Sequence, residues 1–171
     1  QTLTESILEE RQLLAEIKDA ADFLIDTSEM GINRFRNEIK GVFTEGNEAS
    51  KLSIIVNSFG FKKGIALDSD LVFDVRFLPN PFYLPALREL TGNDERVQDY
   101  VMSFEESKVF FDKVADMVMY LIPHYIKEGK TQLIISFGCT GGRHRSVTMA
   151  NKLGAYLSEQ KQRTVVRHRD S

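Results

Sequence analysis

The chain has no tryptophan, a single cysteine (Cys139) and four prolines among its 171 residues. One cysteine excludes an intramolecular disulfide framework and a cysteine-rich zinc site. Apolar stretches such as residues 71–73 and 133–137 are far shorter than the about 20 residues of a membrane-spanning helix. Hydrophobic residues still make up 42% of the chain, which excludes a disordered or fibrous protein. We therefore expect a soluble, cytoplasmic protein with neither a metal site nor a resident cofactor.

Charge is distributed unevenly along the chain, although the net charge is only -3. Residues 1–50 carry 11 acidic and 5 basic side chains, and residues 51–130 carry 12 and 10. Residues 131–171 carry 2 acidic and 7 basic side chains. An excess of cations in one segment favours an anionic partner there, although small domains also have uneven surfaces without any such role.

Residues 1–50 show two helical patterns and one short apolar run. Apolar spacing predicts a helix over residues 2–21, a buried strand at 23–25, and a second helix with Ile32, Phe35, Ile39 and Phe43 on one face. Three elements cannot enclose a core. We expect residues 1–45 to be part of a larger domain and residues 46–51, which contain no large apolar side chain, to be a linker.

Residues 52–171 alternate between strand and helix patterns. Strands are predicted at 52–56, 71–75, 133–137 and 164–167, and helices at 83–90, 94–103 and 105–127. A further helix, with Val147, Ala150, Leu153 and Leu157 on its apolar face, follows a glycine-rich loop. This alternation predicts a three-layer α/β domain with a mostly parallel sheet.

The glycine-rich loop is the most informative segment. It joins the strand at 133–137 to the following helix and reads Gly-Cys-Thr-Gly-Gly-Arg-His-Arg-Ser over residues 138–146. Unpaired N–H groups and the helix dipole attract anions at such a junction, and glycines let the backbone approach a ligand. Arg145 can grip two phosphate oxygens, and Ser146 can cap the helix. We expect a phosphate cradle; the alternative is an ordinary strand-to-helix turn.

Cys139 and Arg145 also have the Cys-x5-Arg spacing of cysteine-dependent phosphatases, in which a thiolate attacks phosphorus. Those enzymes usually have a histidine where this chain has Gly138. They also use a Trp-Pro-Asp-like loop as general acid, and this chain has no tryptophan. We therefore expect no catalytic residue, and we keep the phosphatase as the less favoured hypothesis.

Five stretches occur together in a fixed order: 58–62, 73–81, Thr91-Gly92, 138–147 and 167–169. Together they resemble the RapZ/YvcJ family of bacterial P-loop nucleotide-binding proteins, whose best-known member is an RNase adapter. Residues 21–28 resemble the end of the family's NTPase domain. The resemblance implies a P-loop NTPase domain, of which residues 1–45 would be a C-terminal remnant, and a ligand-sensing domain over residues 52–171.

In the sensing domain, the resemblance implies binding of a phosphorylated amino sugar or its nucleotide derivative, small-RNA binding in some members, and homo-oligomers. The chain has no Gly-x-x-x-x-Gly-Lys-Ser/Thr stretch, so we expect no ATP or GTP hydrolysis. Phe82 stands where the RNA-binding relatives carry a histidine.

Matching the family's motifs residue by residue implies one ligand site. It comprises Lys62, Asp74, Arg76, Asn80, Cys139, Thr140, Gly141, Gly142, His144 and Arg145, to which the loop chemistry adds Arg143 and Ser146. Asp74 and Arg76 could instead form a structural ion pair, and loop lysines are often only solvated. Candidate RNA contacts are Lys62, Lys63, Arg163, Arg167, His168 and Arg169.

Overall fold

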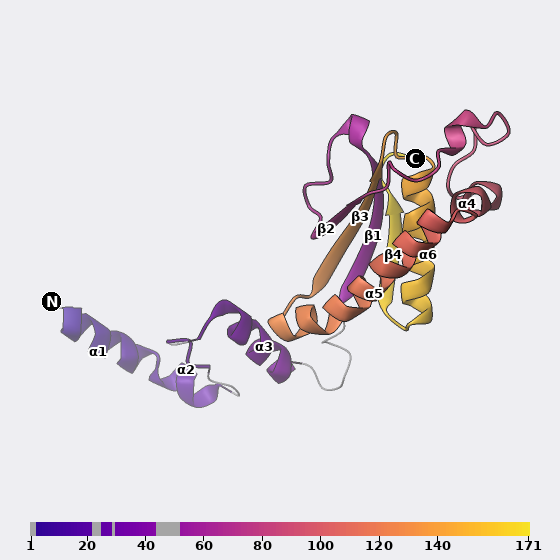
Figure 1. The fold of residues 1–171 in the computed structure, drawn as a ribbon. Helices are drawn as coiled ribbons and strands as arrows, with labels where there is room; N and C mark the ends of the chain where they lie inside the picture. The colour runs from indigo at the N-terminus through magenta and orange to yellow at the C-terminus, as the bar shows by residue number, and fades with distance from the viewer. Residues whose placement is uncertain (1–2, 22–24, 29, 44–51) are drawn as a thin grey trace. The chain divides into compact units, whose positions relative to one another are not determined.

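The computed structural model describes residues 3–21, 25–28, 30–43 and 52–171. It divides into two compact units, Gln1–Ala49 and Ser50–Ser171 (Figure 1).

The first unit contains three described helices, α1 (Leu3–Leu13), α2 (Ala15–Ala20) and α3 (Ile32–Phe43). The helix expected over residues 2–21 is divided at Leu14, where ψ is -6°, although Leu14 still donates its N–H to the Glu10 carbonyl at 3.0 Å. Helix α3 covers the second predicted helix. Phe23 and Leu24 of the predicted strand lie outside the described residues, as does the linker, and Ile25 is in neither helix nor strand.

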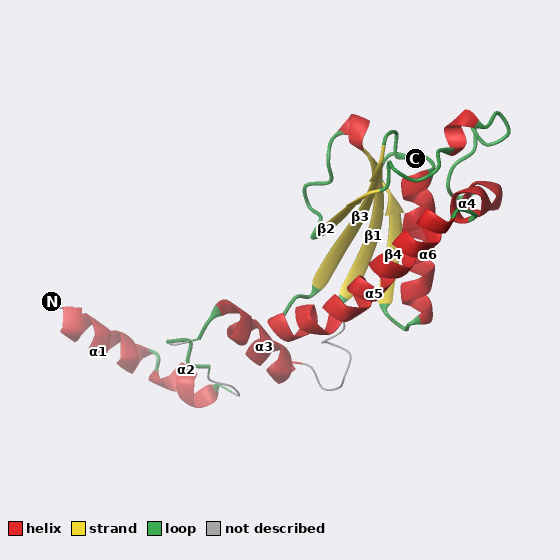
Figure 2. Ribbon diagram, viewed as in Figure 1, coloured by secondary structure: helices red, strands yellow, loops and turns green. Residues whose placement is uncertain are grey.

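The second unit is built on a four-stranded sheet with the order β2-β3-β1-β4 (Figure 2). Its strands are β1 (Ser53–Gly60), β2 (Leu71–Asp74), β3 (Gln132–Cys139) and β4 (Arg163–His168). All three pairings are parallel; Ser53 is opposite both Gln132 and Arg163, and Leu71 is opposite Ile135. The α/β class and the parallel sheet are therefore confirmed, with helices flanking the sheet.

Three helices accompany the sheet: α4 (Glu95–Met102), α5 (Glu105–Glu128) and α6 (Arg145–Glu159). Asp94 caps α4 by accepting the Arg96 N–H at 3.0 Å. Helix α5 ends at Gly129, whose φ of 94° is the left-handed conformation that terminates helices. Helix α6 begins directly after the loop that follows β3, so its N-terminus lies at the carboxyl end of the sheet.

The core lies between the sheet and the two long helices. Alternate residues of β1 and β3, including Ile54, Val56 and Ile135, form one buried cluster with residues of α5 and α6 such as Val118 and Leu153. Burial of this apolar area drives folding, and it anchors both ends of the loop between β3 and α6. None of the described helices is long and apolar enough to cross a membrane.

One predicted helix is wrong. Residues 83–90 form turns, preceded by a short 3₁₀ helix at Pro81–Tyr83. Pro79, Pro81 and Pro85 each lack a backbone N–H, and each disfavours helical geometry in the residue before it. The apolar spacing of this segment therefore reflects packing of a turn, in which Leu87 is buried.

Candidate anion-binding site

The loop 140–144 connects the end of β3 to the start of α6. Gly142 has a φ of 76°, and a Cβ atom there would lie 2.7 Å from the Gly60 nitrogen, so the turn requires glycine. Gly141 is different, because its Cβ would meet no atom within 4 Å. One glycine lets the loop fold back against β1, and the other faces open space.

Several backbone donors of the loop point to no protein acceptor. Within the described part of the chain, no hydrogen bond is found for the N–H groups of Gly141, Arg143 or His144. These groups lie next to the N-terminus of the 15-residue helix α6, where the macrodipole adds positive potential. Donors and dipole together suit an oxyanion.

Cys139 is buried at the base of the loop. Its sulfur lies 3.1 Å from the Ser146 hydroxyl oxygen. Burial opposes ionisation of the thiol, but hydrogen bonds from Ser146 and from the Gly142 amide, with the charge of Arg145, outweigh it and hold the pKa of Cys139 below its ordinary value. The same groups that favour a thiolate also favour a bound anion.

Arg145 is buried and ties the loop to a neighbouring segment. Its Nη1 donates to the carbonyls of Arg76 and Leu78, the latter at 3.1 Å, and its Nη2 donates to Thr140 Oγ1 at 3.4 Å. Its Nε is buried without a hydrogen-bond partner among the described residues. These acceptors are neutral, so they orient the guanidinium without cancelling its charge.

Arg143 is held in a similar way. Its Nε donates to the Leu90 carbonyl at 3.2 Å, and its Nη2 donates to the Glu89 carbonyl. The Glu89 carboxylate is 3.9 Å from Nη2 and exposed, so it screens this charge only weakly.

His144 is the residue directly before α6, and its side chain is buried. Its Nε2 lies 3.2 Å from the Arg88 carbonyl oxygen, which can only accept, so Nε2 carries a proton. Desolvation is the largest influence and lowers the pKa of His144. The imidazole is therefore neutral at neutral pH and contributes hydrogen bonding rather than charge.

These side chains surround a pocket of about 420 Å³, a volume typical of small-molecule sites. Its lining contains four permanent cations and one carboxylate: Lys62, Arg88, Arg143 and Arg145 against Glu89. The other lining residues are Asn80, Phe82, Tyr83, Cys139, Thr140, Gly141 and His144. Eight of the twelve sequence-predicted ligand residues therefore lie around one pocket.

The remaining four predicted ligand residues do not line this pocket. Gly142, in the middle of the loop, and Ser146, in the first turn of α6, are buried. Asp74 accepts three bonds from the Arg76 side chain at 2.5–2.9 Å, and this pairing lowers the pKa of Asp74. Arg76 also lies over the Phe61 ring at 4.2 Å and borders an adjoining hollow that shares Asn80 and Arg145 with the pocket.

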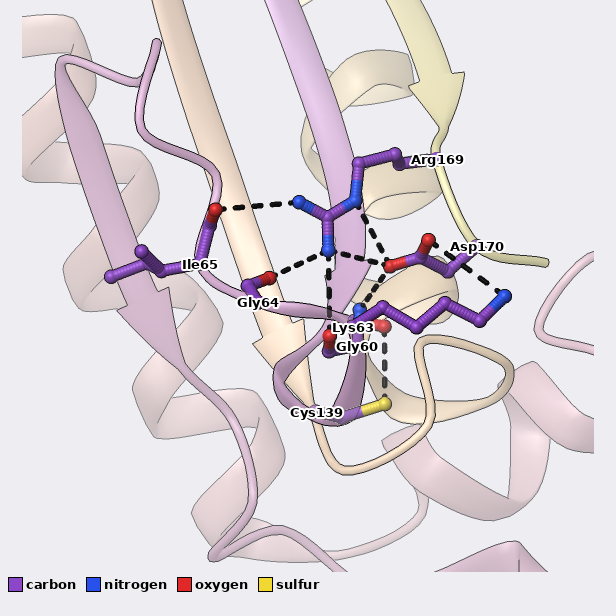
Figure 3. Close-up of polar contacts among 8 residues, drawn as sticks. Gly60, Lys63, Gly64, Ile65, Cys139, Arg169 and Asp170 are labelled. Carbon is purple, nitrogen blue, oxygen red and sulfur yellow. Dashed lines mark hydrogen bonds and ion pairs between the residues drawn. The ribbon is translucent and has the colours of Figure 1, made fainter.

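The C-terminal cations have unequal surroundings. Arg169 donates to the carbonyls of Gly60, Gly64 and Ile65 and binds Asp170, as Figure 3 shows. His168 Nδ1 lies 2.9 Å from Ser58 Oγ. Arg163 and Arg167 are exposed on β4, and Lys63 reaches within 3.9 Å of Asp170. Arg169 and His168 therefore hold the fold together, whereas Arg163 and Arg167 face solvent.

Sequence analysis missed four pocket residues, namely Phe82, Tyr83, Arg88 and Glu89. Phe82 and Tyr83 lie two and three residues after Asn80, which the resemblance assigns to the site. The helix predicted at 83–90 gave no reason to place Tyr83, Arg88 and Glu89 together at a pocket.

Comparison with known proteins identifies the family of the chain. The model of the RapZ C-terminal domain matches residues 52–171. The chain belongs to the RapZ family. It is 51% identical over 168 residues to a nucleotide-binding protein of Thermoanaerobacter sp. (strain X514), covering 98% of this chain and 59% of that protein. It is 54% identical over 165 residues to one of Clostridium botulinum (strain Eklund 17B / Type B), covering 96% and 56%.

This RapZ-family chain therefore spans less than three-fifths of the length of these relatives. The matched model covers the whole unit that contains the pocket. No group of histidine, cysteine, aspartate and glutamate side chains suited to a metal ion occurs among the described residues.

Proposed function

We propose that residues 52–171 form a non-catalytic sensing domain for a phosphorylated amino sugar or its nucleotide derivative, such as glucosamine 6-phosphate or UDP-N-acetylglucosamine. As part of a cytoplasmic nucleotide-binding protein, the domain would regulate the metabolism of cell-envelope precursors. Homo-oligomers of the chain and small RNA are further proposed partners.

The observation that carries this proposal is the loop between β3 and α6. Its unpaired N–H groups, the N-terminus of α6 and the Arg145 guanidinium converge beside one pocket. Because Arg143 and Arg145 are oriented mainly by carbonyl oxygens, their charges remain available to an anion. Charge-assisted bonds of this kind are stronger than neutral ones.

A sensing role is favoured over catalysis by the absence of a positioned acid in the pocket. Among the described lining residues, Glu89 is the only carboxyl group, and its side chain is exposed and lies near Arg143. A general acid for ester cleavage must be held within hydrogen-bond reach of the leaving oxygen. The Glu89 carboxylate is exposed to solvent near Arg143, so the pocket does not hold it in such a position.

Calorimetric titration tests the proposal. The chain is titrated separately with glucosamine 6-phosphate and with UDP-N-acetylglucosamine, and circular dichroism verifies that it is folded. We expect saturable binding of at least one of them. No binding of either at millimolar concentration to folded protein would overturn the proposal.

A cysteine-dependent phosphatase is the second candidate, favoured by the Cys139–Ser146 hydrogen bond and the lowered pKa of the thiol. The thiolate would attack phosphorus and expel the alcohol, and water would then hydrolyse the cysteinyl phosphate. Turnover of an aryl phosphate that disappears in Cys139→Ser would establish this reaction. Absence of turnover by the unmodified chain would contradict the phosphatase and favour the sensing role.

An RNA-binding adapter is the third candidate. Arg163 and Arg167 lie four register positions apart on the edge strand β4, and both are exposed. Phosphate contacts from such residues would make RNA affinity fall as salt rises.

A further inference from the structure

One end of the pocket carries an exposed group made of Phe82, Tyr83 and Arg88, which we name the aromatic rim. The side chains of Phe82 and Tyr83 are 50% and 75% exposed, and their ring centroids are 6.1 Å apart. The Arg88 guanidinium lies over the Phe82 ring, 5.1 Å from its centroid. All three residues line the pocket that contains the phosphate-cradle loop.

The rim is held rigidly although it is exposed. Asn80 Oδ1 accepts the Phe82 N–H at 3.3 Å and so caps the 3₁₀ helix. Arg88 Nε donates to the Phe82 carbonyl at 3.1 Å, and prolines fix the backbone on both sides. Exposed aromatic side chains held in one geometry are typical of binding surfaces, because little entropy is lost when a planar partner stacks on them.

Charge in the pocket favours a ligand with several negative charges. Four cations, Lys62, Arg88, Arg143 and Arg145, line it. The only described carboxylate at the pocket belongs to Glu89, whose side chain is 81% exposed and lies near Arg143. Two linked phosphates would engage more of these cations than a single phosphate.

We propose that the ligand is a nucleoside diphosphate, free or esterified to a sugar, with its phosphates on the loop 140–144 and its base stacked on the aromatic rim. Phenylalanine, tyrosine and arginine all stack on nucleobases, and such stacking is tolerant of base identity. This inference rests on the phosphate site proposed above and adds the part of the ligand that lies farther from it.

Calorimetry with pyrophosphate and UDP separates the two parts of the site. We expect UDP to bind at least about tenfold more tightly than pyrophosphate, as stacking of one base allows. In the double variant Phe82→Ala/Tyr83→Ala, UDP affinity falls to that of pyrophosphate, whereas pyrophosphate affinity is unchanged. Tyr120→Ala is the matched control, because Tyr120 is an exposed aromatic residue of α5 that contacts His124 and does not line the pocket.

A second readout uses the absence of tryptophan from the chain. Phe82→Trp introduces a single fluorophore at the rim, and Tyr120→Trp introduces one at the control position. UDP should quench fluorescence at position 82 but not at position 120, and pyrophosphate should quench neither. Unlike the alanine variants, Phe82→Trp keeps an aromatic ring at the rim, so the fluorescence measurement does not depend on truncating a side chain.

Three results would overturn the inference: equal affinities for UDP and pyrophosphate in the unmodified chain, an equal loss of both in the double variant, or tighter binding of glucosamine 6-phosphate than of UDP. If pyrophosphate binds and UDP binds no more tightly, the base site is contradicted but the phosphate site is supported. Failure of pyrophosphate, UDP and glucosamine 6-phosphate to bind folded protein would overturn both proposals.

Discussion

The Cys139 sulfur lies 3.1 Å from the Ser146 hydroxyl oxygen, which joins the last residue of β3 to the second residue of α6. The contact closes the base of the loop 140–144. It also places the one thiol of the chain among hydrogen-bond donors, which favours its ionised form.

Ser146→Ala should raise the pKa of Cys139, because it removes a hydrogen bond that stabilises the thiolate while the burial that opposes ionisation remains. The expected result is slower alkylation by iodoacetamide at neutral pH, with the rate profile displaced to higher pH. Mass spectrometry can follow the alkylated fraction of Cys139 directly, because the chain has only one cysteine. Ser158→Ala, which removes a hydroxyl bonded to the Gly154 carbonyl on the same helix, is the control. An unchanged profile in Ser146→Ala would contradict the assignment.

Gly141→Ala should weaken binding without destabilising the fold, whereas Gly142→Ala should destabilise the fold. The first adds a methyl group where no atom lies within 4 Å, so the melting temperature should stay close to that of the unmodified chain while pyrophosphate affinity falls. The second forces alanine to a φ of 76° against Gly60, so it should destabilise the fold by about 1 kcal/mol or more. Thermal unfolding and calorimetry together separate the two. Equal melting temperatures for the two variants would show that the loop geometry is wrong.

Arg145→Ala should weaken pyrophosphate binding by about tenfold or more, the value of one charge-assisted bond. It should also lower the melting temperature, because the Arg76 and Leu78 carbonyls lose their donor. Arg143→Ala provides the contrast. Its side chain is partly exposed, so affinity should fall with a smaller loss of stability. An unchanged affinity in both variants would argue against an anion at the loop.

Asp170→Asn should destabilise the protein at neutral pH by about 1–3 kcal/mol. The Asp170 side chain is only 6% exposed and accepts the Gly60 N–H at 2.8 Å. Burial opposes its ionisation, but Arg169, the Gly60 amide and Lys63 prevail and lower the pKa of Asp170. Its stabilising effect is therefore present above its unfolded pKa of about 3.9 and is lost as pH falls below it. Urea titrations at pH 7 and pH 3 should show the difference from the unmodified chain shrinking. Asp99→Asn, an exposed carboxylate on α4, should change little.

RNA binding should depend on the solvent-exposed cations of β4. A gel shift with a stem-loop RNA should show binding at about 50 mM salt that weakens strongly by about 200 mM. Binding should disappear in Arg163→Ala/Arg167→Ala. Arg169→Ala is unsuitable for this purpose, because it also frees the carbonyls of Gly60 and Gly64. No shift even at low salt would contradict an RNA-binding role for these cations.

The parallel sheet could be predicted because its strands are local apolar runs. The run 133–137 and the glycine-rich loop after it indicated a strand-to-helix junction without tertiary information. The end of β1 could not be predicted in this way. The predicted strand ends at Val56, before the polar residues Asn57 and Ser58, yet β1 continues to Gly60. Its last residues pair with β3, and Ser58 also pairs with His168 of β4, 110 residues away.

The site was predictable where its residues are neighbours in sequence. Residues 139–145 are contiguous and comprise the end of β3, the loop 140–144 and the first residue of α6. Asp74 and Arg76 form a local ion pair, as the alternative interpretation of these residues predicts. The aromatic rim was not predictable, because the Arg88 side chain folds back to the Phe82 carbonyl, a contact that apolar periodicity does not report. Of the apolar residues at 83–90, which lie in turns, only Leu87 is buried.

The hydrogen bond between Asp170 and Gly60 also implies that the loop 140–144 is supported only after the C-terminal segment has been synthesised. The Cβ of Asp170 lies beside Gly142. The loop 140–144 is therefore supported by a C-terminal segment that is translated about 30 residues after it. The pairing of β4 with β1 joins parts of the chain more than 100 residues apart, and contacts of such long range form late in folding. A ribosome-bound chain that ends before residue 163 would contain every cation of the pocket without the support that holds its loop in place. Competence to bind should therefore arise only once β4 has emerged.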